Sequence, residues 1–414
     1  MAERTGVGGV SEGWIVAIVG AVQFVNILDF MMVMPLGPDF ARDLGIDVGH
    51  IGIVGGTYTA AAAVGGLLGA GLLDRLDRRT ALGLAMLGLA IGTLSGAFAT
   101  SLPTLLVARA LAGLFGGPAT SVAGSIIADV VPAQRRGQAM GKVMAAFSVA
   151  SVLGVPAGLE IARLGTWRAP FVVVALLSAV VTTLALRQLP SMRGHLVAGA
   201  RGVPLRSLFG TPEVWVSYAI VGLATLSAFA LIPNISAHVQ LNLHYPRAWL
   251  GLLYMAGGVV SLGVMQIVGR LVDRVGSAPV TLVGALGFCV VVWLGFVDDA
   301  AHLSVIGIFM AFMAVQSTRN VAQQTLLSKV PGPAERAGFM SIQSAVQHMA
   351  SAVGAFASSA FLVERGGRLE GVSKVAWFTI ALTLVTPPLF FWLERAIGRR
   401  KPTVPVTAPA APTG

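Results

Sequence analysis

Long apolar stretches separated by short polar breaks run along almost the whole chain. Each stretch holds about 20 or more mainly apolar residues, the length that a helix needs to cross the hydrocarbon core of a bilayer. Because a helix satisfies its own backbone groups in lipid, the pattern predicts an all-α polytopic membrane protein with twelve transmembrane helices. The predicted spans are 14–37, 48–72, 80–100, 102–130, 139–162, 168–189, 213–237, 248–271, 278–297, 302–328, 338–363 and 373–393.

The one long polar break, residues 190–212, divides these helices into six and six. Several short motifs of the first half return about half a chain later, which indicates two pseudo-symmetric six-helix bundles. Paired six-helix repeats with a binding site at their interface are typical of transporters. The repeated motifs are Asp74-Arg75 with Asp273-Arg274, Val130–Arg136 with Val330–Arg336, and Ala150–Gly154 with Ala350–Gly354. The predicted parts are an N-terminal bundle at 1–189, a cytoplasmic linker at 190–212, a C-terminal bundle at 213–397 and a disordered cytoplasmic tail at 398–414.

Charge is scarce and is distributed unevenly between the two sides of the predicted membrane. Only 11% of the 414 residues are charged, whereas soluble domains carry roughly 25%. Most of the 28 Lys and Arg residues fall in the breaks that lie on the same side as both termini. The positive-inside rule then places both termini in the cytoplasm of a cell (inner) membrane. The net charge of +10 therefore reflects topology, and we expect no nucleic-acid partner.

Residues for metal binding or enzymatic chemistry are not grouped in any familiar motif. Cys289 is the only cysteine, so neither an intrachain disulfide nor a metal site is expected. The sequence contains no H-E-x-x-H, no nucleotide P-loop and no G-x-S-x-G. We therefore expect a monomeric protein of the bilayer that is not an enzyme and needs no cofactor. Any uphill transport must use an ion gradient, such as a proton gradient.

The turn between the second and third predicted helices has the charged sequence Asp74-Arg75-Leu76-Asp77-Arg78-Arg79, and it resembles a motif of the major facilitator superfamily. That family carries a G-x-L-a-D-R-x-G-R-K pattern there, and a second copy of the turn occurs in the second half. The resemblance implies the twelve-helix fold of that family and alternating access to a central site. The first copy aligns at Ala70, Leu72, Asp74, Arg75, Asp77, Arg78 and Arg79, with Ala70 and Asp77 at the two glycine positions; the second copy aligns at Gly269, Leu271, Asp273, Arg274 and Gly276.

The resemblance also gives this turn a conformational role. In the family, the turn aspartate caps a neighbouring helix and pairs with arginines in one of two end states. We expect Asp74 and Arg78 to form such a latch, with Asp129 as a partner. A carboxylate and a guanidinium partly withdrawn from water bind well in one packing and separate in the other. The alternative is that the arginines only anchor topology. The full set of latch candidates is Asp74, Arg75, Arg78, Asp129, Asp273 and Arg274.

Further motifs resemble this family and, within it, the drug and sugar efflux branch. The fourth helix has the R-x-x-x-G element of the family as Arg109 and Gly113, and Leu28-Asp29-Phe30 of the first helix suits the efflux branch. The fifth helix carries a proline–glycine element followed by Trp167-Arg168. Small residues allow helices to approach one another closely. Such contacts suit either helices that slide during transport or helices that are packed statically. The helix-packing candidates are Gly154, Pro156 and Gly158.

Polar residues inside the predicted spans are the candidates for function. Asp29 lies within the first helix, with Gln23 and Asn26 on about the same face. A carboxylate at this depth must face a cavity, find a partner or take up a proton. Arg109 and Arg319 are its candidate partners. Asp29 is therefore either a proton-coupling site or half of a fixed ion pair.

Two neighbouring helices of the second half carry polar stripes at helical spacing. One polar face on an apolar helix predicts that the face borders an aqueous cavity. His348, in the second of these stripes, and Glu160 of the fifth helix are rival proton sites, although His348 also suits a structural role and Glu160 an interfacial pair with Arg163. The cavity candidates are Gln23, Asn26, Arg109, Asn234, Gln316, Arg319, Asn320, Gln323, Gln343 and Gln347, and the stripes also contain Gln324, Ser344 and Ser351.

We expect a secondary transporter that exports a small organic molecule, a drug, sugar or metabolite, by proton-coupled alternating access. The alternative is an uptake symporter or facilitator for a sugar or organic anion, since two intramembrane arginines favour an anionic ligand. A remote alternative is a membrane sensor that no longer transports. The small-molecule substrate itself is not specified by the sequence.

Overall fold

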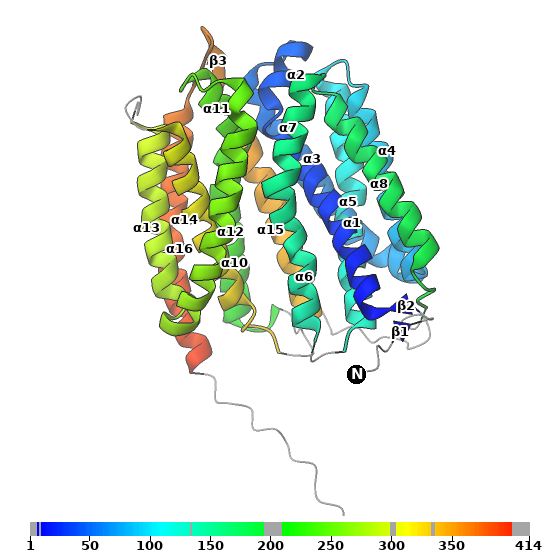
Figure 1. Ribbon diagram of the computed structural model, residues 1–414. Helices are drawn as coiled ribbons and strands as arrows, with labels where there is room; N and C mark the ends of the chain where they lie inside the picture. Colours follow the sequence, from blue (N-terminus) through cyan, green and yellow to red (C-terminus); the bar gives the residue numbers. More distant parts are fainter. Residues whose placement is uncertain are drawn as a thin grey trace, which may run out of the picture.

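The computed structural model describes residues 6–7, 10–132, 135–193, 209–298, 304–332 and 336–399, without the side chains at 6–7, 70–72, 74, 137 and 336–337. In these ranges the chain forms a bundle of long helices that run between two ends (Figure 1). The all-α prediction is thereby confirmed. We call the end with α2 and β3 the α2 end, and the end with β1 and β2 the β1 end.

The first half contains six long helical spans, and its fifth span is made of three consecutive segments. A short helix, α2, follows the first span. The elements are β1 (Gly6–Val7), β2 (Val10–Ser11), α1 (Glu12–Val33), α2 (Gly37–Leu44), η1 (Val48–His50), α3 (Ile51–Leu72), η2 (Leu73–Arg75), α4 (Arg78–Ala97), α5 (Leu102–Val130), α6 (Arg136–Val149), η3 (Ala150–Gly154), α7 (Val155–Leu164) and α8 (Ala169–Gln188).

The second half repeats this order with six more long spans and ends on α16. A two-stranded hairpin precedes the last span. The elements are α10 (Pro212–Leu231), η5 (Ile232–Asn234), α11 (Ile235–Leu241), η6 (Arg247–Trp249), α12 (Leu250–Val275), α13 (Ser277–Phe296), α14 (Val305–Leu327), α15 (Arg336–Ser359), β3 (Val363–Arg365), β4 (Arg368–Glu370) and α16 (Val372–Gly398).

Eleven helical stretches of the described residues are long and apolar enough to cross a membrane. The remaining span, α15, is 24 residues long. Its polar residues, among them Gln343, Gln347 and His348, lower its hydropathy. It nevertheless packs against α10 and α3 as part of the bundle. A polar helix in this position is one that faces other protein or water rather than lipid.

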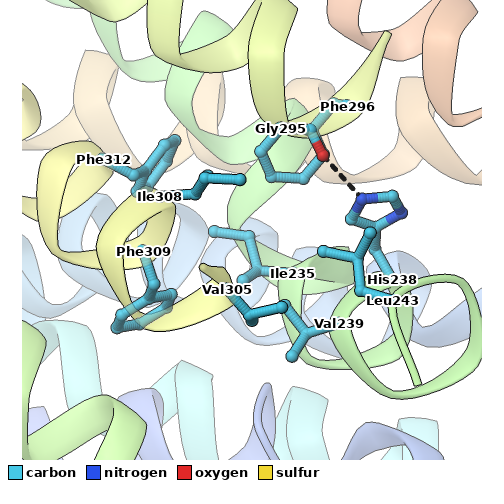
Figure 2. A pocket seen from close by; sticks show the side chains of 10 residues that line it. All are labelled: Ile235, His238, Val239, Leu243, Gly295, Phe296, Val305, Ile308, Phe309 and Phe312. Atoms are coloured by element: carbon cyan, nitrogen blue, oxygen red, sulfur yellow. Dashed lines mark hydrogen bonds between the residues drawn. The ribbon is translucent and has the colours of Figure 1, made fainter. Parts of the chain in front are cut away.

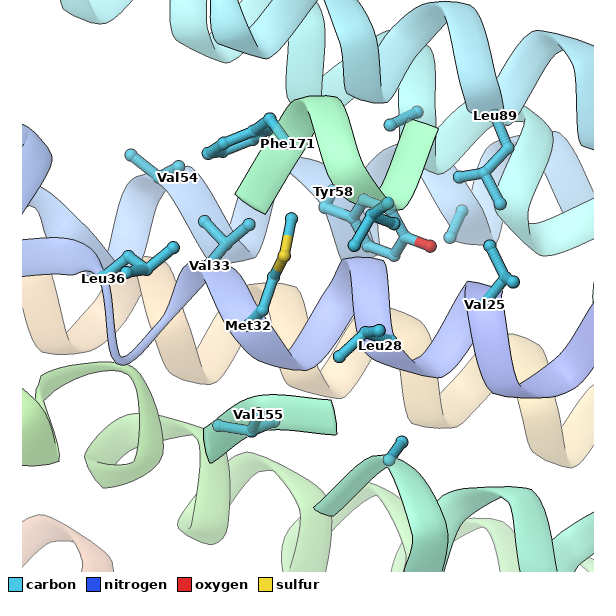
Figure 3. Packing of buried hydrophobic residues seen from close by; sticks show 14 of the residues in the cluster. Val25, Leu28, Met32, Val33, Leu36, Val54, Tyr58, Leu89, Val155 and Phe171 are labelled. Carbon is cyan, nitrogen blue, oxygen red and sulfur yellow. The ribbon is translucent and has the colours of Figure 1, made fainter. Parts of the chain in front are cut away.

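Helix α1 lies in the core of the first half, because apolar residues occur on all its sides and only a few polar ones interrupt them. It packs against α5, α6 and α8. Figure 3 shows Leu28 and Met32 of α1 among side chains from other helices, including Tyr58 of α3 and Val155 of α7. Leu28 is 7% exposed and Met32 is 1% exposed. The polar residues of α1 are therefore held within protein.

The fifth span changes its winding where it passes between the two halves. Segment η3 is a π-helical turn, and Pro156 follows two residues later. A proline has no N–H to complete the helical ladder, and such wide turns accompany irregular hydrogen bonding. A Cβ on Gly154 would lie 2.8 Å from Leu28 Cδ1, whereas one on Gly158 would make an ordinary contact at 3.8 Å. Of these two glycines, Gly154 is the one that packing requires.

Two pairs of long helices form the largest contacts between the halves, α3 with α15 and α12 with the η3–α7 segment. Glycines make the first contact close. A Cβ on Gly52 would lie 2.5 Å from the Ala355 carbonyl oxygen, and one on Gly56 would lie 2.7 Å from the Phe356 ring. These contacts belong to the part of α3 nearest the α2 end. By contrast, a Cβ on Gly66, further along α3, would meet nothing within 4 Å.

The α2 end differs from the prediction in two places. The first span was predicted to extend to residue 37, but α1 ends at Val33 and α2 begins after the break. Pro35 has no N–H to continue the helical hydrogen bonds of α1, and Pro38 occupies the first turn of α2. The eleventh span was predicted to reach residue 363, but β3 begins there instead. Gly366 and Gly367, with φ of 56° and 74°, form the turn of the β3–β4 hairpin.

The predicted linker and tail fall largely on residues that the structure does not describe. Helix α8 ends at Gln188 and α10 begins at Pro212. Residues 194–208 and 400–414 lie outside the described ranges. The predicted domain boundaries, linker and disordered tail therefore stay predictions.

We expect Gly52→Ala to destabilise the protein, because its methyl group would press on the Ala355 carbonyl at the contact between the halves. The expected loss is about 1–3 kcal/mol, as for other overpacked sites. Thermal unfolding in detergent measures the effect. Gly66→Ala is the matched control on the same helix, and we expect it to be neutral or slightly stabilising. Equal stability of the two variants would contradict the close packing described above.

Candidate functional site

Asp29 and Arg109 form an ion pair inside the first half. Arg109 Nη1 donates to both carboxylate oxygens of Asp29 at 3.1 and 3.2 Å. Thr93 Oγ1 donates to Asp29 Oδ1 at 2.8 Å. The side chains of Asp29 and Arg109 are 0% and 1% exposed. Among the two arginines considered as partners, the structure therefore pairs Asp29 with Arg109.

A second set of hydrogen bonds surrounds this pair. The Arg109 guanidinium lies over the Tyr58 ring, 4.4 Å from its centroid. Tyr58 Oη donates to Asn26 Oδ1 at 2.8 Å. Asn26 Nδ2 donates to the Gly116 carbonyl and to Thr120 Oγ1, both at 2.8 Å. Helices α1, α3, α4 and α5 are thus joined by one polar network.

This network places the polar face of α1 against protein rather than in an open cavity. Asn26 is 6% exposed and Gln23 is 5% exposed. Within the described part of the chain, Gln23 Oε1 has no hydrogen-bond partner. Both carboxylate oxygens of Asp29 are bonded to Arg109 and its side chain is 0% exposed, so the carboxylate does not face water in this conformation.

The polar stripes of α14 and α15 have a different environment. Asn320 and Gln324 of α14 and Gln347 of α15 are exposed, although all three lie well inside long helices. Gln343 is 3% exposed, and its Nε2 lies 3.5 Å from Gln324 Oε1. Exposed amides at membrane depth indicate a water-accessible face. Gln323, by contrast, is 8% exposed and lies on the packed side of α14.

Arg319 lies next to this exposed face and has only neutral partners in the described part of the chain. Its Nη1 donates to Gln316 Oε1 at 3.2 Å, and its Nη2 donates to Ser227 Oγ at 3.1 Å. The guanidinium lies 4.2 Å from the centroid of the Phe288 ring. Arg319 is 4% exposed, whereas Gln316 is half-buried.

The two rival proton sites lie on α15 and α7. His348 is half-buried, and its Nδ1 lies 2.9 Å from the Ser344 carbonyl, which assigns a proton to that nitrogen. Glu160 pairs with Arg163 one turn along α7, with a hydrogen bond of 2.8 Å. Both side chains of that pair are more than 40% exposed. The Glu160–Arg163 pair is therefore at the surface of the bundle.

Asn234, one of the predicted cavity residues, and His238, one helical turn later, contact different helices. Asn234 Nδ2 donates to Ser358 Oγ of α15 at 2.9 Å. His238 Nε2 donates to the Gly295 carbonyl of α13 at 2.8 Å and the ring stacks on Phe296. Figure 2 shows His238 as the single polar side chain among those lining a small apolar cavity between α11, α13 and α14. Its volume is about 20 Å³, which is enough for one water molecule but not for a substrate.

The charged turn of the first half makes one of its predicted pairs. Arg78 Nε lies 3.2 Å from Asp129 Oδ2. Both residues belong to the first half, so this pair by itself does not join the halves. The side chain of Asp74 lies outside the described part of the structure, and Arg75 is exposed. The role of these residues as a latch stays a prediction.

Asp77, at a position where the family pattern has glycine, connects the turn to the segment after α8. It caps α4 by accepting from the Arg79 N–H at 2.8 Å, and it accepts from the Met192 N–H at 3.1 Å. Ser191 Oγ also donates to it. Burial raises the pKa of this carboxyl, but the hydrogen bonds from Ser191, Arg79 and Met192 outweigh it and hold the pKa below the usual 3.8.

The second copy of the turn is bare by comparison. Asp273 and Arg274 are exposed, and in the described residues neither makes a hydrogen bond or ion pair. The start of α13, which follows this turn, is instead capped by a residue of another helix. Glu394 of α16 accepts from the backbone N–H groups of Ser277 and Ala278 at 2.7 and 3.0 Å.

The α2 end holds contacts between the halves that the sequence did not reveal. Arg247 of η6 donates to Asp39 of α2 through Nη2 at 2.6 Å and through Nε at 2.9 Å. Ser236 of α11 donates to the Pro35 carbonyl at 2.8 Å. Asp47 accepts from the Glu364 N–H at 3.1 Å. Between described residues, every hydrogen bond that joins the two halves lies at this end. No sequence motif marked them, because Asp39 and Arg247 are 208 positions apart.

The Trp167-Arg168 motif also contacts α2. Trp167 Nε1 donates to Asp43 at 2.7 Å, and Arg168 donates to the same oxygen. These two hydrogen bonds lower the pKa of the Asp43 carboxyl below its usual value. The motif therefore fixes α2 to the first half. As for metals, no group of metal-ligating side chains occurs in the ranges that the structure describes.

These features define a polytopic membrane protein with two six-helix halves, closed together at one end, and with exposed amides inside its second half. Residues 19–355 match the family model of the major facilitator superfamily, and a second match covers 221–412. The chain belongs to the major facilitator superfamily.

Relatives and solved structures agree with this assignment. The chain is 30% identical over 273 residues to a chloramphenicol resistance protein of Streptomyces lividans, covering 64% of this chain and 68% of that protein. It is 25% identical over 262 residues to an uncharacterised transporter of this type, YwfA, of Bacillus subtilis (strain 168), covering 62% of this chain and 63% of that one.

Among solved structures, a bacterial homologue of the human lysosomal transporter Spinster in an inward-facing and occupied conformation superposes with a TM-score of 0.72 at 16% identity, covering 92% of this chain and 97% of that one. A D-xylose–proton symporter gives 0.72 at 18% identity, with coverages of 91% and 96%. These likenesses show the shared fold. The protein is a multi-pass membrane transporter and not an enzyme.

We expect Asp29→Asn to destabilise the protein by about 3–5 kcal/mol, because it leaves Arg109 buried without its counter-charge. Arg109→Gln should be costly for the same reason. The double variant should lose much less than the sum of the two single losses, since neither charge is then unpaired. Equilibrium unfolding in detergent measures all three. Additive losses would contradict a tightly coupled pair.

We expect Asp77→Ala to lower stability by about 1–2 kcal/mol at pH 7, because α4 loses its cap. The folded pKa of Asp77 lies below 3.8, so its stabilisation is present above about pH 4 and is lost as the pH falls through the folded value. The difference from wild type should therefore narrow towards pH 3. Unfolding midpoints at both pH values measure this. Asp273→Ala, in the bare copy of the turn, is the matched control and should have no effect at either pH.

Proposed function

We propose that this transporter exports a small organic molecule, such as a drug, sugar or metabolite, in exchange for protons. The observation that supports alternating access is the position of the contacts between the halves. Hydrogen bonds and close glycine contacts join the halves at the α2 end, while no hydrogen bond between described residues joins them nearer the β1 end. A bundle sealed at one end and looser at the other is one of the two end states that such a mechanism needs.

The positive-inside rule favours an inward-facing assignment for this state. The charged turn then lies on the cytoplasmic side, and the sealed α2 end faces outward. We place the protein in the cell (inner) membrane, as a monomer with both termini in the cytoplasm. It needs the lipid bilayer and a small-molecule substrate, but no nucleic acid and no cofactor beyond the proton gradient.

Export is favoured over uptake by the kind of relative that the chain matches. The Streptomyces lividans relative is named for chloramphenicol resistance, which suits removal of a compound from the cell. The second candidate is uptake with protons, because a D-xylose–proton symporter shares the fold. The two differ in the direction of proton flow relative to substrate.

The exposed amides of α14 and α15, Asn320, Gln324 and Gln347, are the proposed binding surface, with the half-buried Gln316 beside them. Asp29 is the proposed proton carrier. Its ion pair with Arg109 would have to open during the cycle, and protonation of the carboxylate would remove the attraction that closes it. His348 and Glu160 remain the rival carriers.

Transport in proteoliposomes under an imposed pH gradient tests this proposal. Chloramphenicol, D-xylose and gluconate probe the drug, sugar and anion classes. We expect one of them to move against its gradient and opposite to the protons. Asp29→Asn should lose this accumulation but keep downhill exchange, whereas His348→Gln and Glu160→Gln should keep both. Full accumulation by Asp29→Asn would exclude Asp29 as the carrier, and movement together with protons would establish symport.

A locked variant supplies the negative control. Asp39→Cys and Arg247→Cys, combined with Cys289→Ser, leave two thiols facing each other across the sealed end. A short bismaleimide should join the halves there and stop transport, while the two single-cysteine variants treated in the same way should remain active. Undiminished transport by the cross-linked protein would contradict alternating access through the α2 end.

A further inference from the structure

The two arginines inside the membrane-spanning helices have unlike partners. Arg109 binds the Asp29 carboxylate through Nη1 at 3.1 and 3.2 Å. Arg319 binds Ser227 Oγ at 3.1 Å and Gln316 Oε1 at 3.2 Å. Both guanidinium groups are almost completely buried, at 1% and 4% exposure. One arginine is thus neutralised and the other is solvated only by dipoles.

The same helices of each half supply the two pairs. In the first half, the first span, α1, provides Asp29 and the fourth span, α5, provides Arg109. In the second half, the first span, α10, provides Ser227 and the fourth span, α14, provides Arg319. The second half therefore has a similar arginine site in which a hydroxyl replaces the carboxylate. The positive charge of Arg319 therefore has no counter-charge among the described residues of this site.

No internal group cancels this charge in the part of the chain that the structure describes. No carboxylate there lies within 4.0 Å of the Arg319 guanidinium. An arginine does not lose its proton under ordinary conditions, and burying it without a counter-charge is unfavourable. The Phe288 ring at 4.2 Å offsets only part of that cost. The site is therefore suited to a negative charge from outside the protein.

Two amides connect Arg319 to the water-accessible face. Gln316, which accepts from Arg319, is half-buried, and its Nε2 lies 3.5 Å from Asn320 Oδ1. Asn320 is exposed. A ligand that displaces the Gln316 amide would meet the guanidinium directly. The Gln316 and Asn320 side chains would then remain beside it as further hydrogen-bond donors.

We propose that Arg319 binds a carboxylate of the transported molecule, so that the substrate is a small organic anion carrying a single negative charge at this site. This deepens the proposed transport function and depends on it. The neutral Asp29–Arg109 pair has no such role, because its charge is already balanced. Gln316 and Asn320 orient the anion, and Ser227 holds the guanidinium in place.

Binding of matched ligand pairs to the purified protein tests this proposal. The probes are benzoate with benzamide, gluconate with glucose, and chloramphenicol succinate with chloramphenicol. We expect at least one carboxylate to bind and so raise the unfolding temperature of the protein. Its neutral partner should bind at least about tenfold less tightly, as measured by the ligand concentration needed for the same rise. Equal binding of both members of each pair, or no carboxylate that binds, overturns the proposal. This comparison needs no variant.

Variants then locate the charge that is responsible. Arg319→Gln should weaken the carboxylate at least about tenfold and remove the preference over its neutral partner. Ser227→Asp supplies the missing carboxylate and should have the same effect with Arg319 still present. Ser227→Asn separates the added volume from the added charge, and Arg270→Gln removes one exposed arginine on α12 as a control. A carboxylate preference that survives both Arg319→Gln and Ser227→Asp overturns the assignment to Arg319.

Failure of the transport proposal has a different signature. Carboxylate-selective binding without gradient-driven movement in proteoliposomes would refute proton-coupled export and leave the anion site in place. Gradient-driven movement of a neutral probe that Arg319→Gln does not alter would support export and refute the anion site.

Discussion

The Asp29–Arg109 ion pair fixes the centre of the first half. Neither charge meets water, so each depends on the other, and the pair ties α1 to α5 at a depth where no solvent can replace a lost bond. Tyr58 and Asn26 extend the connection to α3 and along α5. With its polar atoms turned inward in this way, the first half presents few groups to a ligand. The exposed amides belong to the second half.

Closure at the α2 end combines two kinds of contact. The backbone of Gly52 of α3 packs closely against the Ala355 carbonyl of α15, with the Ser358 and Ser359 hydroxyls beside it. Nearer the rim, the Asp39–Arg247 pair adds an attraction that weakens once water enters. Opening this end therefore requires both the helix packing and the ion pair to separate.

Much of the fold could be predicted because membrane helices leave a strong periodic signal, and the twelve spans lie close to where hydropathy places them. The helical ends at Pro35 and the β3–β4 hairpin could not, since apolar residues continue through both places and only the backbone geometry of proline and glycine ends the helix there. Hydropathy reports burial from water and says little about where a helix stops.

The candidate residues divide along a similar line. The polar stripe of α14 could be predicted because its residues lie on one helix at helical spacing. The choice of Arg109 over Arg319 as the partner of Asp29 depended on how α1 packs in three dimensions, and so did the Asp39–Arg247 pair. The same holds for Asp77, because its partners Ser191 and Met192 belong to the segment that follows α8 in the sequence. Long-range partners leave no local pattern.

The bonds between Asp77 and Met192 have a consequence for how far the two halves can move apart. They clamp the chain to the first half beyond the end of α8, so the covalent tether between the halves starts later than the helix boundary suggests. An extended chain reaches at most about 3.3–3.6 Å per residue. Each residue that is held at Asp77 therefore shortens the maximum reach of the linker between the halves by that amount. Hydrogen bonds to the Asp77 carboxylate thus help to set the largest separation of the two halves that the linker allows.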